Sequence, residues 1–320
     1  MVVAAVACVV CVATSPAAMV YRVGFDSATG TTNGSEITGV FGGTATIRDA
    51  GGIDSTSAVV TDAPTLGGGG YLQAAVPAST ATPAGVAPQG ATFTPVSPAN
   101  SLAAMYSVSN GHASLNGGFD FFFRPNFTDI NASGGQTFRA LDVSAVASGG
   151  LRVVLSGTAG TNEIRLETIT AANGIGLPSG STTNNVSTGS NPAFQMAAGI
   201  VYHLGVTYST DVDGNVTVNL FGVEGSGPIN TSALTLEEGL LASSTFNFSE
   251  SVVTSTTGLP TGAYDFGILQ AGAATRTQDF DEFRLYNSVP LEFAANIPEP
   301  TALGLLLVGG VLLAGRPRRA

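Results

Sequence analysis

The chain has 320 residues, of which only 10% are charged and 42 are Gly. Its net charge is −11, all 11 of its basic residues are Arg, and outside the C-terminal end those Arg residues are scattered. Nucleic acid and anionic membrane surfaces attract clusters of basic residues, so this composition argues against both as the main partner. Few charges and many Gly, Ser, Thr and Val residues predict short strands joined by Gly-rich turns.

Residues 1–18 are typical of a secretory signal peptide. An apolar run at 2–12 precedes a short stretch of small residues, in which Ser15 and Ala17 occupy the positions expected before a cleavage site. The α-amino group supplies the only positive charge before the run. We expect this segment to form a helix during export and to be removed.

Both cysteines, Cys8 and Cys11, fall within this apolar run. Their spacing matches a redox motif, but no βαβ pattern surrounds them, so small hydrophobic residues of a signal peptide are the better interpretation. After cleavage the exported chain would contain no Cys and no disulfide.

Alternating apolar and polar residues predict one all-β domain over residues 19–290. The segments expected as strands are 21–26, 44–48, 119–124, 136–143, 151–155, 162–169, 200–208, 216–220, 263–269 and 278–286. We expect residues 77–100, which are rich in Pro, and residues 171–199 to form loops. The apolar faces of these strands predict a core that contains Tyr21, Phe25, Phe121, Leu204, Val206, Phe283 and Leu285.

The part of this domain after residue 200 resembles a laminin-G/concanavalin A-like domain. The resemblance rests on Tyr-His-Leu-Gly-Val-Thr-Tyr at 202–208, an Asp-Gly turn at 213–214, and Asp-Glu-Phe-Arg-Leu-Tyr-Asn at 281–287. It implies an antiparallel two-sheet jelly-roll sandwich with its first strand beside its last. Members of that family include lectins, glycosidases and adhesive modules, so the resemblance alone does not imply a function.

The sequence shows no catalytic constellation. Glycosidases of this fold usually carry Glu-x-Asp-x-x-Glu on one strand, and the chain lacks that pattern. His112 and His203 have no Cys, Asp or Glu at metal-ligand spacing, and no Gly-x-Ser-x-Gly sequence has the strand-then-helix context of a nucleophile elbow. We therefore predict no catalytic residue and a protein that is not an enzyme.

A structural calcium ion is the one cofactor with support in the sequence. The last expected strand places Phe283 and Leu285 inward, and a period of two then makes Asp279 and Asp281 point inward as well. A buried carboxylate needs a partner. A calcium ion bound by Asp26 and Asp281 would supply one. The alternative is that Asp281 accepts hydrogen bonds from loop amides or pairs with an Arg.

The C-terminal end has three parts, each with a physical role. The first part, a linker that ends in a Pro-Glu-Pro motif, is kept extended by its prolines. The apolar second part would reach ~22 Å as a helix, which is short for a hydrocarbon core of ~30 Å. The arginines should stay on the cytoplasmic side. The parts are the motif Pro298, Glu299 and Pro300 at the end of a linker at 291–300, the apolar run 301–315, and Arg316, Arg318 and Arg319 in a basic tail at 316–320.

In this order the three parts resemble the PEP-CTERM sorting signal of Gram-negative bacteria. The resemblance implies that an exosortase, a membrane enzyme, processes the exported protein, which crosses the inner membrane only transiently. An ordinary C-terminal transmembrane anchor is the alternative, although an anchor has no use for the two prolines.

The sequence therefore predicts an exported, non-enzymatic protein of the cell surface or extracellular matrix, sorted by its C-terminal signal. The alternative is a carbohydrate-binding, lectin-like module with an extracellular polysaccharide as its partner. That module would have to use tyrosines, because the chain has no Trp. Apart from the calcium ion, no cofactor is expected, and nucleic acid is not expected as a partner.

Overall fold

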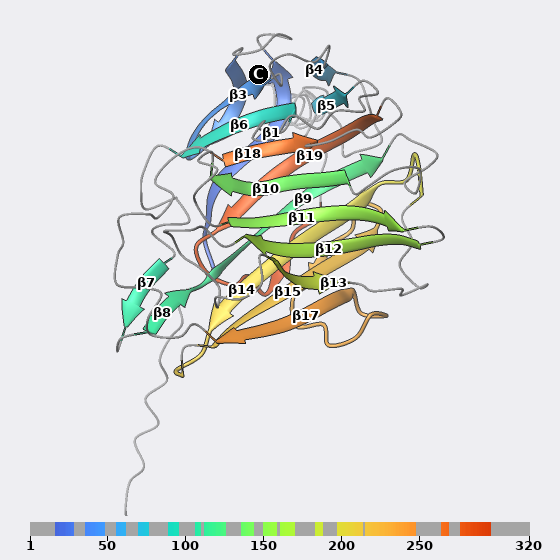
Figure 1. Ribbon diagram of the computed structural model, residues 1–320. Coiled ribbons are helices and arrows are strands. Elements are labelled where there is room, and N and C mark those ends of the chain that lie inside the picture. Colours follow the sequence, from blue (N-terminus) through green and yellow to red (C-terminus); the bar gives the residue numbers. More distant parts are fainter. Residues whose placement is uncertain are drawn as a thin grey trace, which may run out of the picture.

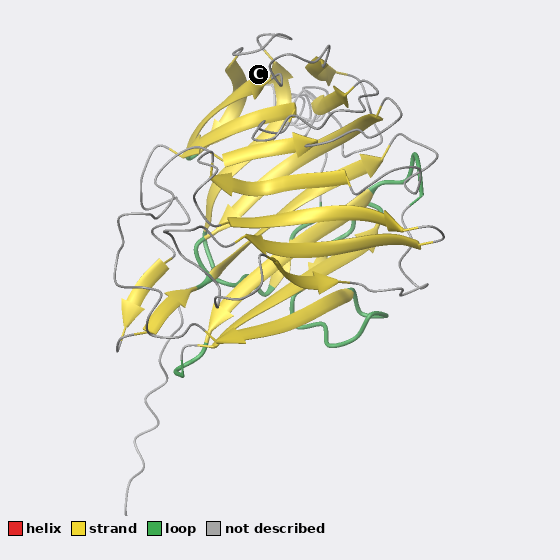
Figure 2. Cartoon of the chain, viewed as in Figure 1, coloured by secondary structure: helices red, strands yellow, loops and turns green. Residues whose placement is uncertain are grey.

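The computed structural model describes about half of the chain, and this part is all-β. The described residues are 17–28, 36–48, 56–61, 70–76, 89–95, 106–109, 112–125, 136–143, 150–158, 161–169, 183–187, 197–213, 215–247, 264–268 and 276–295. They form strands joined by loops and turns (Figure 2). None of these residues belongs to a helix long and apolar enough to cross a membrane.

Twenty strands are formed by the described residues. They are β1 (Met19–Ala28), β2 (Glu36–Phe41), β3 (Gly43–Arg48), β4 (Thr56–Thr61), β5 (Gly70–Val76), β6 (Gln89–Pro95), β7 (Tyr106–Ser109), β8 (His112–Leu115), β9 (Gly117–Pro125), β10 (Gln136–Val143), β11 (Gly150–Thr158), β12 (Thr161–Ile169), β13 (Thr183–Ser187), β14 (Tyr202–Thr210), β15 (Asn215–Glu224), β16 (Ile229–Asn230), β17 (Leu240–Asn247), β18 (Tyr264–Ile268), β19 (Arg276–Tyr286) and β20 (Glu292–Phe293).

Sixteen of these strands belong to one antiparallel sheet that rolls onto itself. Its main order is β13-β12-β11-β10-β18-β6-β3-β2-β1-β19-β9-β14-β15-β17, and β4 and β5 join it beside β19. Strands β10, β11 and β12 lie in front of β9, β14 and β15, so the rolled sheet makes two layers (Figure 1). This all-β, antiparallel arrangement is that of a β-sandwich.

The core lies on one face of the layer that contains β9, β14 and β19. Phe119, Phe121 and Phe123 alternate along β9 and are fully buried, and β14 presents Leu204 opposite Phe121 and Val206 opposite Phe119. All seven residues that the sequence predicted for the core have no exposed surface. The first strand also lies beside the last long strand, as predicted, since β1 pairs with β19. The hairpin predicted around residues 211–215 is confirmed in its strands, because β14 pairs antiparallel with β15.

Two segments expected as loops contain strands instead. β6 lies within the Pro-rich stretch 77–100, where it pairs with β3 and β18, and its single proline, Pro95, is its last residue. A proline at a strand end removes no hydrogen bond from the middle of the ladder, so the Pro-rich composition of the stretch hid the strand. β13 lies within 171–199 and pairs with β12.

A bulge in β19 corrects the sequence-based assignment of inward and outward residues. Asp281 lies opposite Phe122 and Arg284 lies opposite Asp120, so β19 has one extra residue here. The extra residue lies at Glu282, whose φ is 52°. Because one inserted residue reverses the alternation, Asp281 lies on the face opposite to that of Phe283.

The expectation that Asp279 and Asp281 point the same way as Phe283 and Leu285 is therefore wrong. The Phe283 ring packs 6.1 Å from the Phe119 ring in the core. The two aspartates belong to the other, polar face of the sheet.

Several predictions concern residues outside the described part of the chain. They are most of the signal peptide with Cys8 and Cys11, the sorting motif Pro298, Glu299 and Pro300, the apolar run 301–315, and Arg316, Arg318 and Arg319. These stay predictions.

Candidate functional site

The polar face of the central sheet collects charged residues from three neighbouring strands. Side chains alternate between the two faces of β9. Phe119, Phe121 and Phe123 point into the core, so Asp120 and Phe122 point to the other face. β14 pairs His203 with Phe122, and β19 pairs Arg284 with Asp120. Three sequence-distant residues, Asp120, His203 and Arg284, thus form one buried group, which we call the charge cluster.

Asp120 is the centre of the charge cluster. Its Oδ2 lies 2.7 Å from Nε2 of His203, and its two oxygens accept hydrogen bonds from Nε of Arg284 at 3.2 and 3.1 Å. Nη2 of Arg284 forms a further ion pair with it. The other ring nitrogen of His203, Nδ1, donates to the carbonyl oxygen of Gly227 at 2.6 Å, since a carbonyl oxygen can only accept. The cluster therefore ties three strands to a loop.

The polar face is covered by residues 287–295, which we call the C-terminal strap. Arg284 donates from Nη2 to the carbonyl oxygen of Ala294 at 2.6 Å. Phe293 is fully buried, and its ring lies 5.5 Å from that of Tyr286. A Cβ atom added to Gly205 would lie 2.5 Å from the Phe293 ring, so the strap needs a glycine beneath it.

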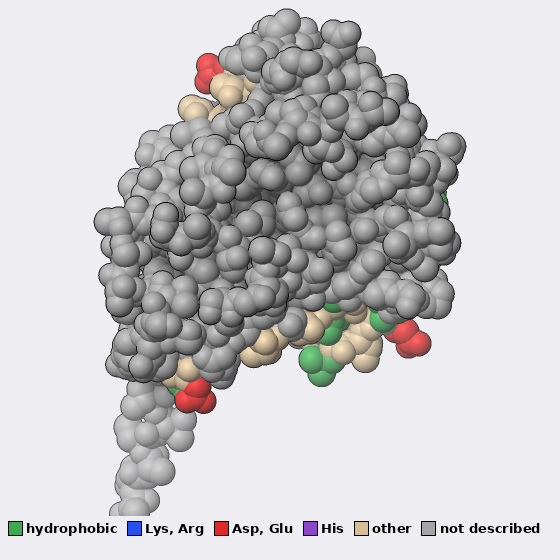
Figure 3. All heavy atoms as spheres, in the orientation of Figure 1, with side chains coloured by type: hydrophobic (Ala, Val, Ile, Leu, Met, Phe, Trp, Pro, Cys, Tyr) green, Lys and Arg blue, Asp and Glu red, His purple; other side chains and the backbone are tan. Residues whose placement is uncertain are grey.

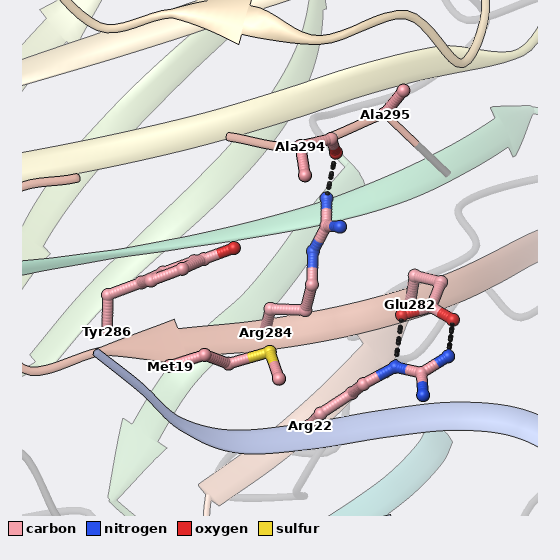
Figure 4. Close-up of a pocket in the computed structure, with 7 residues that line it drawn as sticks. All are labelled: Met19, Arg22, Glu282, Arg284, Tyr286, Ala294 and Ala295. Carbon is pink, nitrogen blue, oxygen red and sulfur yellow. Dashed lines mark hydrogen bonds and ion pairs between the residues drawn. The ribbon is translucent and has the colours of Figure 1, made fainter. Parts of the chain in front are cut away.

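A pocket of about 320 Å³ opens between the start of β1, the end of β19 and the strap. Met19, Arg22, Glu282, Arg284, Tyr286, Ala294 and Ala295 line it (Figure 4). Arg22 donates from Nε to Oε2 of Glu282 at 2.7 Å and forms a second ion pair through Nη2. The Arg22 side chain keeps 26% of its surface exposed, so this pair forms the wet rim of the pocket.

Burial and neighbouring charges change the proton affinity of two pocket residues. The pKa of the Tyr286 hydroxyl is raised, first by burial and then by the negative charge of Asp120. The pKa of Arg284 is also raised, because the charge and hydrogen bonds of Asp120 outweigh the opposing effect of burial, the largest single contribution. At neutral pH the phenol is thus neutral and the guanidinium is charged.

A second charged group lies further along β19. Arg124 donates from Nε to Oδ2 of Asp279 at 2.9 Å, and Gln73 donates to Oδ1 of the same carboxylate at 3.1 Å. The Arg124 guanidinium also stacks over the Tyr71 ring, 5.6 Å from its centroid. This group links β5, β9 and β19, and it satisfies a carboxylate that the sheet buries completely.

The residues predicted to bind calcium have different surroundings. Asp281 is buried, and its Oδ1 accepts the backbone N–H of Glu282, the next residue of β19, at 2.8 Å. Asp26 lies in β1. Across the described ranges, no group of three or more His, Cys, Asp and Glu side chains is arranged to hold a metal ion. The calcium ion stays a prediction.

Among the side chains whose exposure the structure describes, the exposed charged ones are acidic. Exposed carboxylates stand at the rim of the molecule on the face drawn in Figure 3, where no Lys or Arg side chain of the described residues is visible. The exposed acids are Glu36, Asp211, Asp213, Glu224, Glu237, Glu238 and Glu292. By contrast, Arg22, Arg124 and Arg284 are each paired with a buried acid.

No family model and no curated protein matches the chain. Solved structures match it at low sequence identity. An endo-β-1,4-glucuronan lyase from the fungus Trichoderma reesei has a TM-score of 0.44 and 10% identity, covering 81% of this chain and 95% of its own. The alginate lyase Aly36B has a TM-score of 0.41 and 13% identity, covering 74% and 86%. Arcelin-5, a lectin-like defence protein from Phaseolus vulgaris, has a TM-score of 0.37 and 10% identity, covering 73% and 91%. Such likeness concerns the fold alone.

The prediction of a non-enzymatic protein is wrong. Most of the solved structures that the chain resembles are lyases of polysaccharides, which are enzymes, and the lectin-like arcelin-5 gives the alternative of a lectin-like module little support. The prediction used the absence of a known catalytic pattern, and such a pattern recognises only the chemistry it was defined for.

Sequence reasoning missed Asp120, Arg22 and Glu282 as members of a site. Arg284 was noticed only as part of a strand pattern. The available signal was the run Asp-Phe-Asp-Glu-Phe-Arg at 279–284, which places four charges in one buried strand. Charges in such a strand require partners on neighbouring strands.

Proposed function

We propose that this chain is an exported β-sandwich protein that an exosortase-type enzyme processes at its C-terminus. The supporting observation is the closeness of the folded domain to the sorting motif. The strap is anchored up to Ala294 by Arg284, and Pro298 follows four residues later. A processing enzyme in the membrane would therefore meet a motif that begins four residues after the last anchored residue.

In this proposal a transmembrane helix at 301–315 exists only in the precursor, and the arginines after it hold that precursor in the inner membrane. The domain then reaches the cell surface or the extracellular matrix. The resemblance to PEP-CTERM proteins and to laminin-G domains supports this.

Export in a host that has an exosortase tests the proposal. A variant with Pro298→Ala and Pro300→Ala should accumulate in the inner membrane fraction, whereas the wild type should appear outside it. The matched control is Pro228→Ala, which changes a proline in a loop of the domain and should leave sorting unchanged. Equal distribution of the wild type and the double variant would refute the proposal.

We propose as a second candidate that the domain acts as an enzyme on a polysaccharide that carries carboxylate groups. The favouring observation is the pocket of Figure 4, which presents two guanidiniums, a carboxylate and a phenol within about 320 Å³. Guanidiniums suit carboxylates, and an aromatic ring suits the apolar face of a sugar. Because its pKa is raised, the Tyr286 hydroxyl stays protonated at neutral pH, so it can act as a hydrogen-bond donor to an oxygen of a bound sugar.

Incubation of the purified protein with alginate or glucuronan, followed by measurement of new chain ends, tests this second candidate. Cleavage should be lost with Tyr286→Phe and reduced at least tenfold with Arg22→Met, while Asn219→Ala, which removes a hydrogen bond to Ser243 on another strand, should have no effect. Moderate salt should accelerate cleavage, since the exposed acids repel a polyanion. Failure to cleave either polymer would count against this candidate without touching the proposal on export.

A further inference from the structure

The first residue before β1 is held by the start of the strap. The backbone N–H of Ala18 donates to Oδ1 of Asn287 at 3.0 Å, and the backbone N–H of Asn287 donates to the carbonyl oxygen of Ala18 at 3.1 Å. The pair extends the β1–β19 ladder, in which Met19 lies opposite Tyr286. Asn287 thus uses both its backbone and its side chain to bind one residue.

An independent observation in the sequence points to the same residue. Signal peptides are cut after a small residue, with another small residue two positions earlier. A cut between Ala17 and Ala18 satisfies this rule with Ala17 and Ser15, whereas a cut one residue later would place Pro16 at the earlier position.

We propose that the peptide bond between Ala17 and Ala18 is the export cleavage site and that Asn287 receives the new N-terminus. This proposal rests on export as proposed above. A signal-peptide-cutting enzyme adds one water across the bond, which leaves a carboxylate on Ala17 and an ammonium group on Ala18. The nitrogen that donates to Asn287 Oδ1 is the same atom before and after the cut.

The cut strengthens this contact because it changes the donor. An α-amino group with a pKa near ~7.7–8.0 is largely charged at pH 7, and a charged donor forms a stronger hydrogen bond than an amide N–H. Both ends of the processed domain would then be fastened to β19 and the strap, since Asn287 holds Ala18 and Arg284 holds Ala294. The mature chain then begins at Ala18, directly after the cut that Ser15 and Ala17 indicate, so the signal peptide is one residue shorter than the range 1–18.

The N-terminal residue of the exported protein is the first test. Mass analysis after export should give a chain that begins at Ala18, and Ala17→Leu should block or displace the cut. A mature chain that begins at any other residue would overturn the inference while leaving export intact. A chain that keeps residues 1–17 would contradict export as well.

Amine labelling tests the docking on Asn287. All 11 basic residues are Arg, so the α-amino group is the single amine of the chain. An amine-reactive reagent should modify Asn287→Ala roughly fivefold faster than the wild type, because the hydrogen bond that shields the amine is gone. Asn219→Ala is the matched control and should label at the wild-type rate.

Asn287→Asp keeps an acceptor oxygen at the same position and should label as slowly as the wild type. This variant keeps the inference falsifiable if Asn287→Ala fails to fold. Equal labelling rates in the wild type and Asn287→Ala, or fast labelling of Asn287→Asp, would overturn the docking.

Discussion

The charge cluster and the Arg22–Glu282 pair both join β19 to a neighbouring strand by an ion pair, yet their surroundings differ. Asp120 and His203 are completely buried, whereas the Arg22 side chain keeps 26% of its surface exposed. Buried charges are costly unless every partner is present, and exposed pairs are worth little because water and salt screen them. The cluster is therefore part of the architecture, whereas water reaches the rim pair through Arg22 while its partner Glu282 is buried.

Removal of Arg284 should give the largest effect, because it removes a partner from the buried charge cluster. Arg284→Met leaves Asp120 buried with one partner fewer and frees the strap at Ala294. We expect the free energy of unfolding to fall by about 3–5 kcal/mol, measured by urea denaturation. A loss below about 1 kcal/mol would mean that the cluster is not structural.

A methyl group beneath the strap should have the next largest effect. In Gly205→Ala the new Cβ meets the Phe293 ring at 2.5 Å, and overpacking of this kind costs about 1–3 kcal/mol. The cost should shrink in a Phe293→Ala background, because the ring is then absent. Gly227→Ala, whose added Cβ meets nothing within 4 Å, is the control. An equal cost of Gly205→Ala in both backgrounds would show that the strap does not lie on Gly205 in solution.

The Tyr286 hydroxyl, at the junction of the two regions, should make alkaline stability pH-dependent. Its pKa is raised in the folded state, so the unfolded chain loses this proton first as pH rises. The neutral hydroxyl contributes fully to the stability of the folded state below pH ~10, which is the pKa of Tyr in the unfolded chain. This contribution is lost as the pH rises toward the higher pKa of Tyr286 in the folded state. The free energy of unfolding of the wild type and of Tyr286→Phe should be measured between pH 8 and 12. Above pH ~10 it should fall more steeply for the wild type than for the variant. Parallel curves would contradict the raised pKa.

Removal of the rim pair should give the smallest effect. Arg22→Met should lower the free energy of unfolding by about 1–2 kcal/mol, because water reaches the Arg22 side of the pair but the buried Glu282 carboxylate loses a partner. The loss should shrink further in high salt. A loss as large as that of Arg284→Met would erase the contrast between the two regions.

The strands and core of this domain were predictable because alternation acts locally. The apolar residues of 119–123 and 204–208 predicted buried faces that the structure confirms. Strand β6 was not predictable in the same way, because its Pro- and Ala-rich surroundings suppressed the signal, and its partners β3 and β18 are distant in sequence.

The candidate site was mostly hidden from sequence reasoning. The bulge at Glu282 reverses the inward and outward alternation of side chains along β19, and no pattern in the sequence predicts this bulge. The cluster of Asp120, His203 and Arg284 needs three strands to be registered correctly, which only tertiary structure provides. The enzyme prediction failed for a related reason, since it searched for one known arrangement on one strand.

The intact mass of the protein recovered from outside the inner membrane tests the central claim, export followed by processing, most directly. The account predicts a chain that has lost its N-terminal segment and the residues after about Pro300, and that retains the strap through Ala295. A chain that ends at Ala320 and requires detergent for extraction would contradict it and would show an ordinary membrane anchor.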